Sequence, residues 1–76
     1  MEIKVPIVST EGNKKGVLVH WYKKDGEFVK EGEEIAELML EKLTLTVKSP
    51  ATGKLKIIVK KNEEISEGKT IGIVEI

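Results

Sequence analysis

The chain has 76 residues, enough for one small domain with a thin core, and we therefore treat residues 1–76 as a single domain. It contains no cysteine, and 13 basic residues balance 13 acidic ones, which argues against a disulfide framework, a zinc–thiolate site and a nucleic-acid-binding surface. No segment approaches the roughly 18 apolar residues of a membrane span, and the N-terminus lacks the apolar stretch of a signal peptide, so we expect no membrane association and a cytoplasmic protein.

Most of the chain is predicted to form short strands. Alternating apolar and polar residues, or enrichment in β-branched residues, predict strands at residues 2–7, 17–22, 43–48, 55–59 and 71–76. Turn signals lie between these segments at Asp25-Gly26, Glu31-Gly32, residues 49–53 and Glu67-Gly68. This arrangement is typical of an all-β domain.

Residues 33–43 are ambiguous when they are taken alone. Apolar residues lie there at helical spacing, with strong helix formers between them, at Ile35, Leu38, Met39 and Leu43. An α+β interaction domain with a helix at this position is therefore one alternative. Its circular dichroism spectrum would show substantial helix.

An internal repeat of about 36 residues favours a strand at residues 33–43. Superposing the two halves pairs Gly16 with Gly53, Leu18 with Leu55 and, after a one-residue gap near Gly26, Glu31 with Glu67, Gly32 with Gly68 and Ile35 with Ile71. The ambiguous stretch then corresponds to the last residues of the chain, which include Gly72 and several β-branched residues and form a poor helix. If the halves share one conformation, residues 33–43 are extended.

Two such half-units are expected to pack face to face as a flattened barrel with quasi-twofold symmetry, because neither can bury its apolar face alone. Each sheet would hold three or four strands, and residues 2–7 would pair with one of the sheets. A hairpin at residues 37–48 would join the halves. Its turn is predicted at residues 40–43, which places Lys42 at an exposed tip.

The order and spacing of these short motifs resemble the biotinyl/lipoyl carrier domains, whose fold is the barrel-sandwich hybrid. The matching residues are the opening strand ending at Pro6, residues 16–21, Lys24-Asp25-Gly26-Glu27, Glu31-Gly32, residues 35–38, Glu41-Lys42, residues 47–50, Gly53, Gly68 and Ile71. Each motif is weak alone, but together they are specific. The resemblance covers nearly the whole chain.

The resemblance implies that Lys42 carries a covalently attached cofactor. The modified lysine lies in a motif similar to Asp-Lys-Ala in lipoyl domains and to Met-Lys-Met in biotinyl domains. Here the residues are Glu41-Lys42-Leu43. The acid before the lysine is more like the lipoyl motif, whereas the apolar residue after it is more like the biotinyl motif. We rank lipoate first, biotin second and an unmodified domain third.

The function implied by the resemblance is that of a swinging-arm carrier, which shuttles acyl intermediates between the active sites of a 2-oxoacid dehydrogenase complex. The expected partners are a lipoate-attaching ligase or transferase, the 2-oxoacid dehydrogenase and the dihydrolipoamide dehydrogenase. The domain itself would not be an enzyme and would hold no catalytic residue, although a parent chain could be a dihydrolipoamide acyltransferase. The alternatives are a biotin carrier of a carboxylase or decarboxylase and an unmodified interaction module.

Residues around Lys42 are expected to be recognised by the modifying enzyme, namely Glu41, Leu43, Leu40 and Met39. Of the last two, we expect one to belong to the core and the other to be exposed. By resemblance, the polar loop at residues 8–15 would lie near Lys42 and help partner enzymes to recognise the domain.

The remaining candidates are interpreted as structural. We expect His20 to be a partly packed strand residue, and no metal site, because no second histidine or cysteine accompanies it. Trp21 is expected to pack against the sheet or against the lysine-bearing face. The pairs Glu33-Glu34 and Glu63-Glu64 are expected to face solvent rather than to act as catalytic acids.

Overall fold

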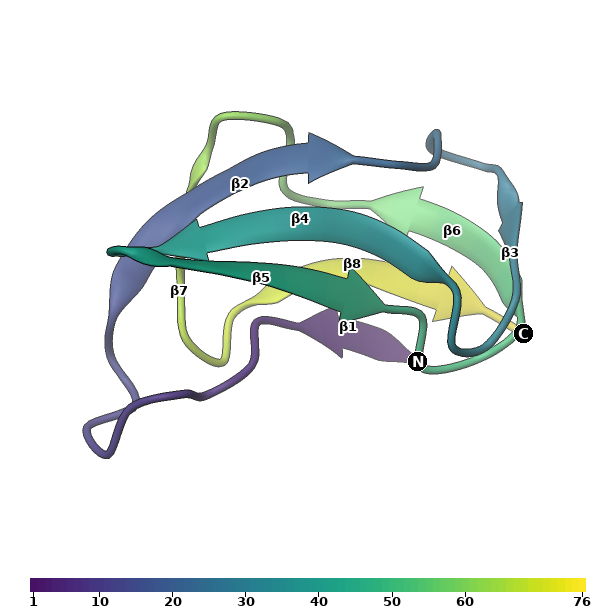
Figure 1. Ribbon diagram of the computed structural model, residues 1–76. Coiled ribbons are helices and arrows are strands. Elements are labelled where there is room, and N and C mark those ends of the chain that lie inside the picture. The colour runs from purple at the N-terminus through teal and green to yellow at the C-terminus, as the bar shows by residue number, and fades with distance from the viewer.

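Eight short strands and no helix make up the computed structural model, which describes residues 1–76 (Figure 1). The strands are β1 (Glu2–Lys4), β2 (Lys15–Trp21), β3 (Phe28–Val29), β4 (Glu34–Leu40), β5 (Leu43–Lys48), β6 (Gly53–Ile57), β7 (Glu64–Ser66) and β8 (Thr70–Glu75). They form two four-stranded antiparallel sheets with the orders β1-β8-β6-β3 and β5-β4-β2-β7. The predicted all-β barrel-sandwich architecture is confirmed.

The two sheets are related by the predicted quasi-twofold symmetry. Exchanging β1 with β5, β2 with β6, β3 with β7 and β4 with β8 converts one strand order into the other. Backbone hydrogen bonds repeat in the same way: the Leu18 N–H donates to the Glu63 carbonyl at 3.0 Å, and the Leu55 N–H donates to the Glu27 carbonyl at 2.9 Å. The two halves thus exchange equivalent bonds, so neither is complete alone.

Glycines at equivalent positions allow the close backbone approach that each half needs. A Cβ atom on Gly16 would overlap the carbonyl oxygen of Met39 in β4, and one on Gly53 would overlap the carbonyl oxygen of Glu75 in β8. Only glycine lacks that atom. The repeat of glycine in the sequence therefore reflects a repeated steric constraint.

The ambiguous stretch is a strand, as the repeat predicted. β4 lies between β5 and β2, so both of its edges are hydrogen-bonded. A register shift between Glu34 and Ala36 brings Ile35 and Ala36 both into the core, after which alternation buries Leu38 and Leu40. Pairing on two edges overrides the helix propensity of these residues.

Several details of the strand predictions are wrong. Several strand bounds shift by up to two residues, as in β6, which covers Gly53–Ile57 rather than residues 55–59. β1 ends at Lys4 rather than at residue 7, because Pro6 has no N–H to donate to a neighbouring strand, and Ile7 is 66% exposed. His20 is exposed rather than partly packed, because a register shift between Leu18 and His20 interrupts the alternation of β2. Its ring instead makes an edge-to-face contact with the exposed Tyr22, with centroids 5.3 Å apart.

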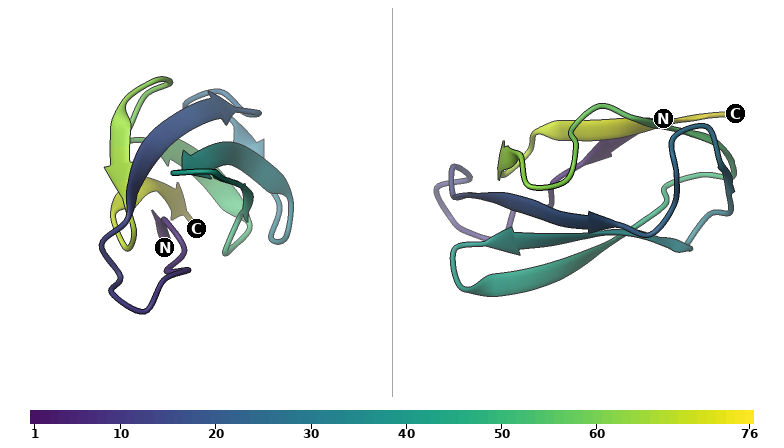
Figure 2. Two further views of the ribbon diagram at one scale, coloured as in Figure 1. Left: turned by 60° about the vertical axis from the view of Figure 1, so that its left-hand side comes forward. Right: turned by 90° about the horizontal axis from the view of Figure 1, so that it is seen from above.

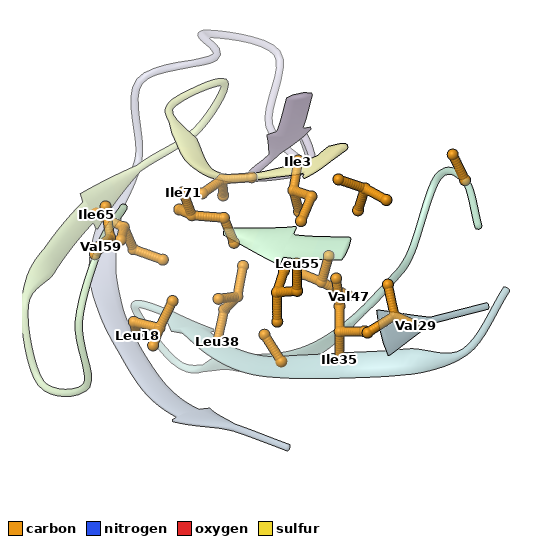
Figure 3. Packing of buried hydrophobic residues seen from close by; sticks show 14 of the residues in the cluster. Ile3, Leu18, Val29, Ile35, Leu38, Val47, Leu55, Val59, Ile65 and Ile71 are labelled. Atoms are coloured by element: carbon orange, nitrogen blue, oxygen red, sulfur yellow. The ribbon is translucent and has the colours of Figure 1, made fainter. Parts of the chain in front are cut away.

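The core lies between the two sheets, where apolar side chains from both meet (Figure 3). Leu18, Leu38 and Leu55 are essentially inaccessible to solvent. Trp21 is partly buried against this core, and its Nε1–H donates to the Val59 carbonyl at 2.8 Å. Gly72 leaves room for the indole, since a Cβ there would lie 3.2 Å from Trp21 Cη2. Of the two predicted positions for Trp21, packing against the sheet is therefore the one observed.

The chain ends meet near one end of the molecule, and the β4–β5 hairpin lies at the other, where the loop before β2 also lies (Figures 1 and 2). The N-terminal amine of Met1 donates to the Val74 carbonyl at 2.6 Å, and the Val74 N–H donates to the Met1 carbonyl at 2.8 Å. The molecule measures 32 × 22 × 16 Å, so this separation runs along its longest dimension. None of its elements is a helix capable of crossing a membrane.

Candidate attachment site at the β4–β5 hairpin

The hairpin that joins the two halves has a two-residue turn, Glu41-Lys42. Leu40 and Leu43 are the last paired residues on either side of it, as the sequence predicted. Glu41 has φ of 56°, in the left-handed region, which costs a residue other than glycine roughly 1–2 kcal/mol. Two-residue hairpin turns require positive φ because it matches the twist of the flanking strands. The strain is therefore the consequence of a very short turn.

Lys42 stands at the tip of this turn with its side chain exposed. It takes part in none of the side-chain hydrogen bonds or ion pairs of the structure. An amine held in this way is accessible from several directions, and no internal partner has to be displaced before it reacts.

The residues flanking the turn differ in burial. Leu40 is 1% exposed and closes the core at this end, whereas Met39 is 39% exposed and Leu43 is 47% exposed. The prediction that one of Met39 and Leu40 is buried and the other exposed is confirmed. Leu40 therefore anchors the hairpin to the body, while Met39, Leu43 and Glu41 remain accessible beside the lysine.

The loop at residues 8–15 lies against the hairpin, as the resemblance implied. Lys14 Nζ lies 3.2 Å from Glu41 Oε2, and the hydrogen bond and charge of Glu41 raise the pKa of Lys14. Between loop and hairpin is a shallow cleft, lined by Val8, Lys14, Leu40, Glu41, Lys42 and Leu43. Four of these residues come from the hairpin and two from the loop, so the loop forms one wall of the cleft that Lys42 also lines.

Glu67 holds the beginning of this loop, a role that the sequence did not indicate. Its side chain is largely buried, with 7% of the residue exposed. Oε1 accepts hydrogen bonds from the backbone N–H groups of Val8 at 3.2 Å and Ser9 at 3.1 Å, and Oε2 accepts one from Ser9 Oγ at 2.8 Å. Burial acts to raise the pKa of Glu67, but these hydrogen bonds together hold it below its usual range.

The other acidic residues singled out by the sequence stabilise turns. Glu33 Oε2 lies 3.0 Å from Lys23 Nζ, and the backbone N–H of Lys30 and the Lys23 ammonium lower the pKa of Glu33. Glu63 Oε1 accepts a hydrogen bond from the Lys60 N–H at 2.6 Å. No group of three or more histidine, cysteine, aspartate or glutamate side chains is arranged to hold a metal ion.

Comparison with known proteins agrees with this geometry. Residues 1–74 match the model of a family described as biotin-requiring enzyme. The chain is 36% identical over 74 residues to the dihydrolipoyllysine-residue succinyltransferase component of the 2-oxoglutarate dehydrogenase complex of Rickettsia bellii, covering 95% of this chain and 18% of that protein. It is 37% identical over 75 residues to the same component of Bartonella vinsonii, covering 97% and 18%.

A solved structure shares the fold. The lipoyl domain of the 2-oxoglutarate dehydrogenase complex of Azotobacter vinelandii matches with a TM-score of 0.77 and 26% sequence identity, covering 100% of this chain and 96% of that one. The chain spans about one fifth of the length of the succinyltransferase components, at 18% of each, and almost the full length of this domain. The chain thus belongs to the biotinyl/lipoyl domain family.

Proposed function

We propose that the chain is a swinging-arm carrier domain that is lipoylated on Lys42. The observation that carries the proposal is the position of Lys42, which is exposed, has no side-chain partner and lies in a two-residue turn. The turn lies at the end of the molecule remote from the chain termini (Figure 1). A lysine that is to enter the active site of a modifying enzyme must be accessible, and a surface turn meets this requirement.

The residues present fit a covalently attached lipoyl group. Lys42 Nζ would form an amide with the activated carboxyl group of lipoate, losing a proton as the activating group leaves. When bound, the dithiolane supplies redox and acyl-transfer chemistry that no side chain of this cysteine-free chain provides. The chain would therefore supply no catalytic residue, and its contribution would be to hold and present the amine.

Rigidity of the hairpin is the second contribution of the chain. β4 is paired on both edges, and Leu40 at its end is buried, so the base of the turn is fixed in the body. The mobile part is then the lysine stem together with the cofactor. A tether of fixed origin raises the effective concentration of the carried group at each active site within its reach.

The relatives support a proposal for the parent assembly. We propose that residues 1–76 are a single carrier domain serving a 2-oxoacid dehydrogenase complex, as part of an acyltransferase component or as a free carrier. Its partners would then be a lipoate-attaching ligase or transferase, the 2-oxoacid dehydrogenase and the dihydrolipoamide dehydrogenase. The similarity to succinyltransferase components favours lipoate over biotin.

Biotin is the second candidate, and one observation favours it. Leu43, directly after the lysine, is apolar and 47% exposed, and it resembles the apolar residue after a biotinylated lysine. A modifying enzyme that recognises exposed apolar residues near the lysine would not require the acidic residue Glu41.

Intact mass measured after co-expression with a lipoate ligase or with a biotin ligase tests both candidates. We expect the mass gain of one lipoyl group, and no gain for Lys42→Ala. Lys61→Ala is the matched control, because Lys61 is another exposed lysine in a turn and should leave the gain unchanged. A biotin adduct alone would replace the proposal by its alternative. The absence of any adduct would favour an unmodified interaction module.

A further inference from the structure

We infer that Glu67 is a positioning residue of the carrier site, holding the loop at residues 8–15 so that Val8 and Lys14 form a wall beside Lys42. The expected effect on modification of Lys42 rests on the proposed function, whereas the contacts between Glu67 and the loop do not depend on it. Glu67 does not touch Lys42 and comes from the turn between β7 and β8, on the second half of the repeat. It would act entirely through the loop.

Glu67 contacts both ends of this loop. Its carboxylate accepts three hydrogen bonds from Val8 and Ser9, at 3.2, 3.1 and 2.8 Å, where the loop begins. Its backbone N–H donates to the Lys14 carbonyl at 3.0 Å, where the loop enters β2. Within the loop, the Gly12 N–H donates to Ser9 Oγ at 3.1 Å, which extends the network from the carboxylate to the far side of the bend. One residue therefore fixes the loop at its two ends.

The anchored residues are those that line the cleft at the attachment site. Val8 and Lys14 are the loop residues that face Lys42 and Leu43, and Val8 is held by its N–H to Glu67. Lys14 is also held from the hairpin side by Glu41. The loop is thus connected to the body by a buried carboxylate and to the hairpin by a surface ion pair.

The repeat shows that this burial is not required by the turn itself. Glu31 is the counterpart of Glu67 and also precedes a glycine with positive φ, Gly32 in one half and Gly68 in the other. Its side chain is exposed and takes part in no hydrogen bond of the structure. The turn therefore forms without a buried carboxylate, and the contacts of Glu67 serve the loop.

The consequence concerns recognition rather than chemistry. An enzyme that encloses Lys42 also meets the loop, because Val8 and Lys14 border the same cleft. If the loop leaves its place, the hairpin and the ε-amine are unchanged, but only a fraction of the molecules presents the complete surface. The apparent affinity for the enzyme then falls by that fraction, while the rate of the bound complex is preserved.

Glu67→Gln tests the inference in the full chain, because it keeps the shape of the side chain but removes its charge and replaces one acceptor with a donor. Glu31→Gln is the matched control. We measure amide hydrogen exchange of residues 8–14, the methyl–methyl nuclear Overhauser effect between Val8 and Leu43, and the kinetics of lipoate attachment by a lipoate ligase with the domain as the varied substrate.

For Glu67→Gln we expect faster exchange in the loop, loss of the Val8–Leu43 effect and a KM for the domain raised about tenfold or more at unchanged kcat, as loss of charge-assisted hydrogen bonds implies. Glu31→Gln should match the wild type in all three. An unchanged loop, an unchanged KM or a fall in kcat alone would overturn the inference.

A second variant and the wild-type result distinguish failure of this inference from failure of the proposed function. If Glu67→Gln fails to fold, Ser9→Ala removes the hydroxyl that bonds Oε2 and should give a smaller change of the same kind; a wild-type loop in this variant would overturn the inference. If the wild type accepts no lipoate, the proposed function fails. The exchange and Overhauser measurements then still decide whether Glu67 holds the loop against the hairpin.

Discussion

The two halves of the molecule have the same strand arrangement but differ at the ends of their equivalent strands. β4 continues through Glu41-Lys42 into β5, whereas its counterpart β8 ends beside the N-terminal strand. The turns before these strands also differ, since Glu31 is exposed and Glu67 is buried. The shared features build the barrel, and these two differences between the halves both lie near Lys42 or the loop beside it. The symmetric features form the scaffold, and the candidate site lies where the two halves differ.

The largest expected effect tests the shared scaffold at its closest backbone contacts. Gly16→Ala and Gly53→Ala should each destabilise the fold by more than about 4 kcal/mol, because the new Cβ overlaps a carbonyl oxygen of the neighbouring strand. Urea unfolding followed by circular dichroism measures this, with exposed Lys54→Ala as the control. A stable, folded variant at only one position would show that the halves are not sterically equivalent.

The core should show the same equivalence with a smaller effect. Leu18 and Leu55 are counterparts and both are essentially inaccessible. Truncating either to alanine should cost about 2–5 kcal/mol through lost burial and the cavity left behind. The exposed Leu43→Ala should cost far less. The comparison uses the midpoints of denaturant unfolding, provided that the dependence of the unfolding free energy on denaturant concentration is the same in each variant. A large difference between Leu18→Ala and Leu55→Ala would contradict an evenly shared core.

Acid should release the loop at residues 8–15 by protonating Glu67. The folded-state pKa of Glu67 lies below its usual value of about 4.3, so the ionised carboxylate stabilises the loop above that pH. This contribution is lost as pH falls through the lowered folded-state value. A carboxyl titration by nuclear magnetic resonance should therefore give a midpoint below pH ~4.3 for Glu67, accompanied by shifts of the Val8 and Ser9 amides. A midpoint at or above the usual value would contradict the anchoring geometry.

The smallest effect is expected at the surface ion pair between loop and hairpin. Lys14→Ala should leave the urea midpoint unchanged within error, because exposed ion pairs contribute little to stability. The ion pair should instead affect the position of the loop relative to Glu41 of the hairpin. Comparing Lys14→Ala with Glu67→Gln by loop amide exchange sharpens the contrast: we expect a much smaller change in Lys14→Ala. An equal change would mean that the surface pair, and not the buried carboxylate, holds the loop.

Much of the fold could be predicted because the repeat constrains both halves at once. The strand at β4 is the clearest case, since its own residues favour a helix and only the comparison with β8 indicates otherwise. The position of Lys42 in a turn followed from the same reasoning. Repetition is informative because two different sequences must satisfy one set of backbone contacts.

The errors arise where local geometry departs from regular alternation. The register shift after Leu18 turns His20 outward, and no residue type in β2 signals it. The end of β1 was predictable in principle, because Pro6 cannot donate a backbone hydrogen bond. Glu67 could not be distinguished from Glu31, since both are glutamates before a glycine. Its role depends on a loop that is distant in sequence.

The meeting of the chain ends opposite the hairpin has a mechanical consequence. Met1 and Val74 pair as neighbouring strands do, so both termini leave from a single pole of a body 32 Å long. Lys42 lies at the opposite end, so rotation of the barrel about a segment joined at the termini would move the amine on a radius close to that length. Under the proposed function, the reach of the lipoyl group would then be the sum of two parts, the rigid barrel and the flexible lysine side chain with its cofactor.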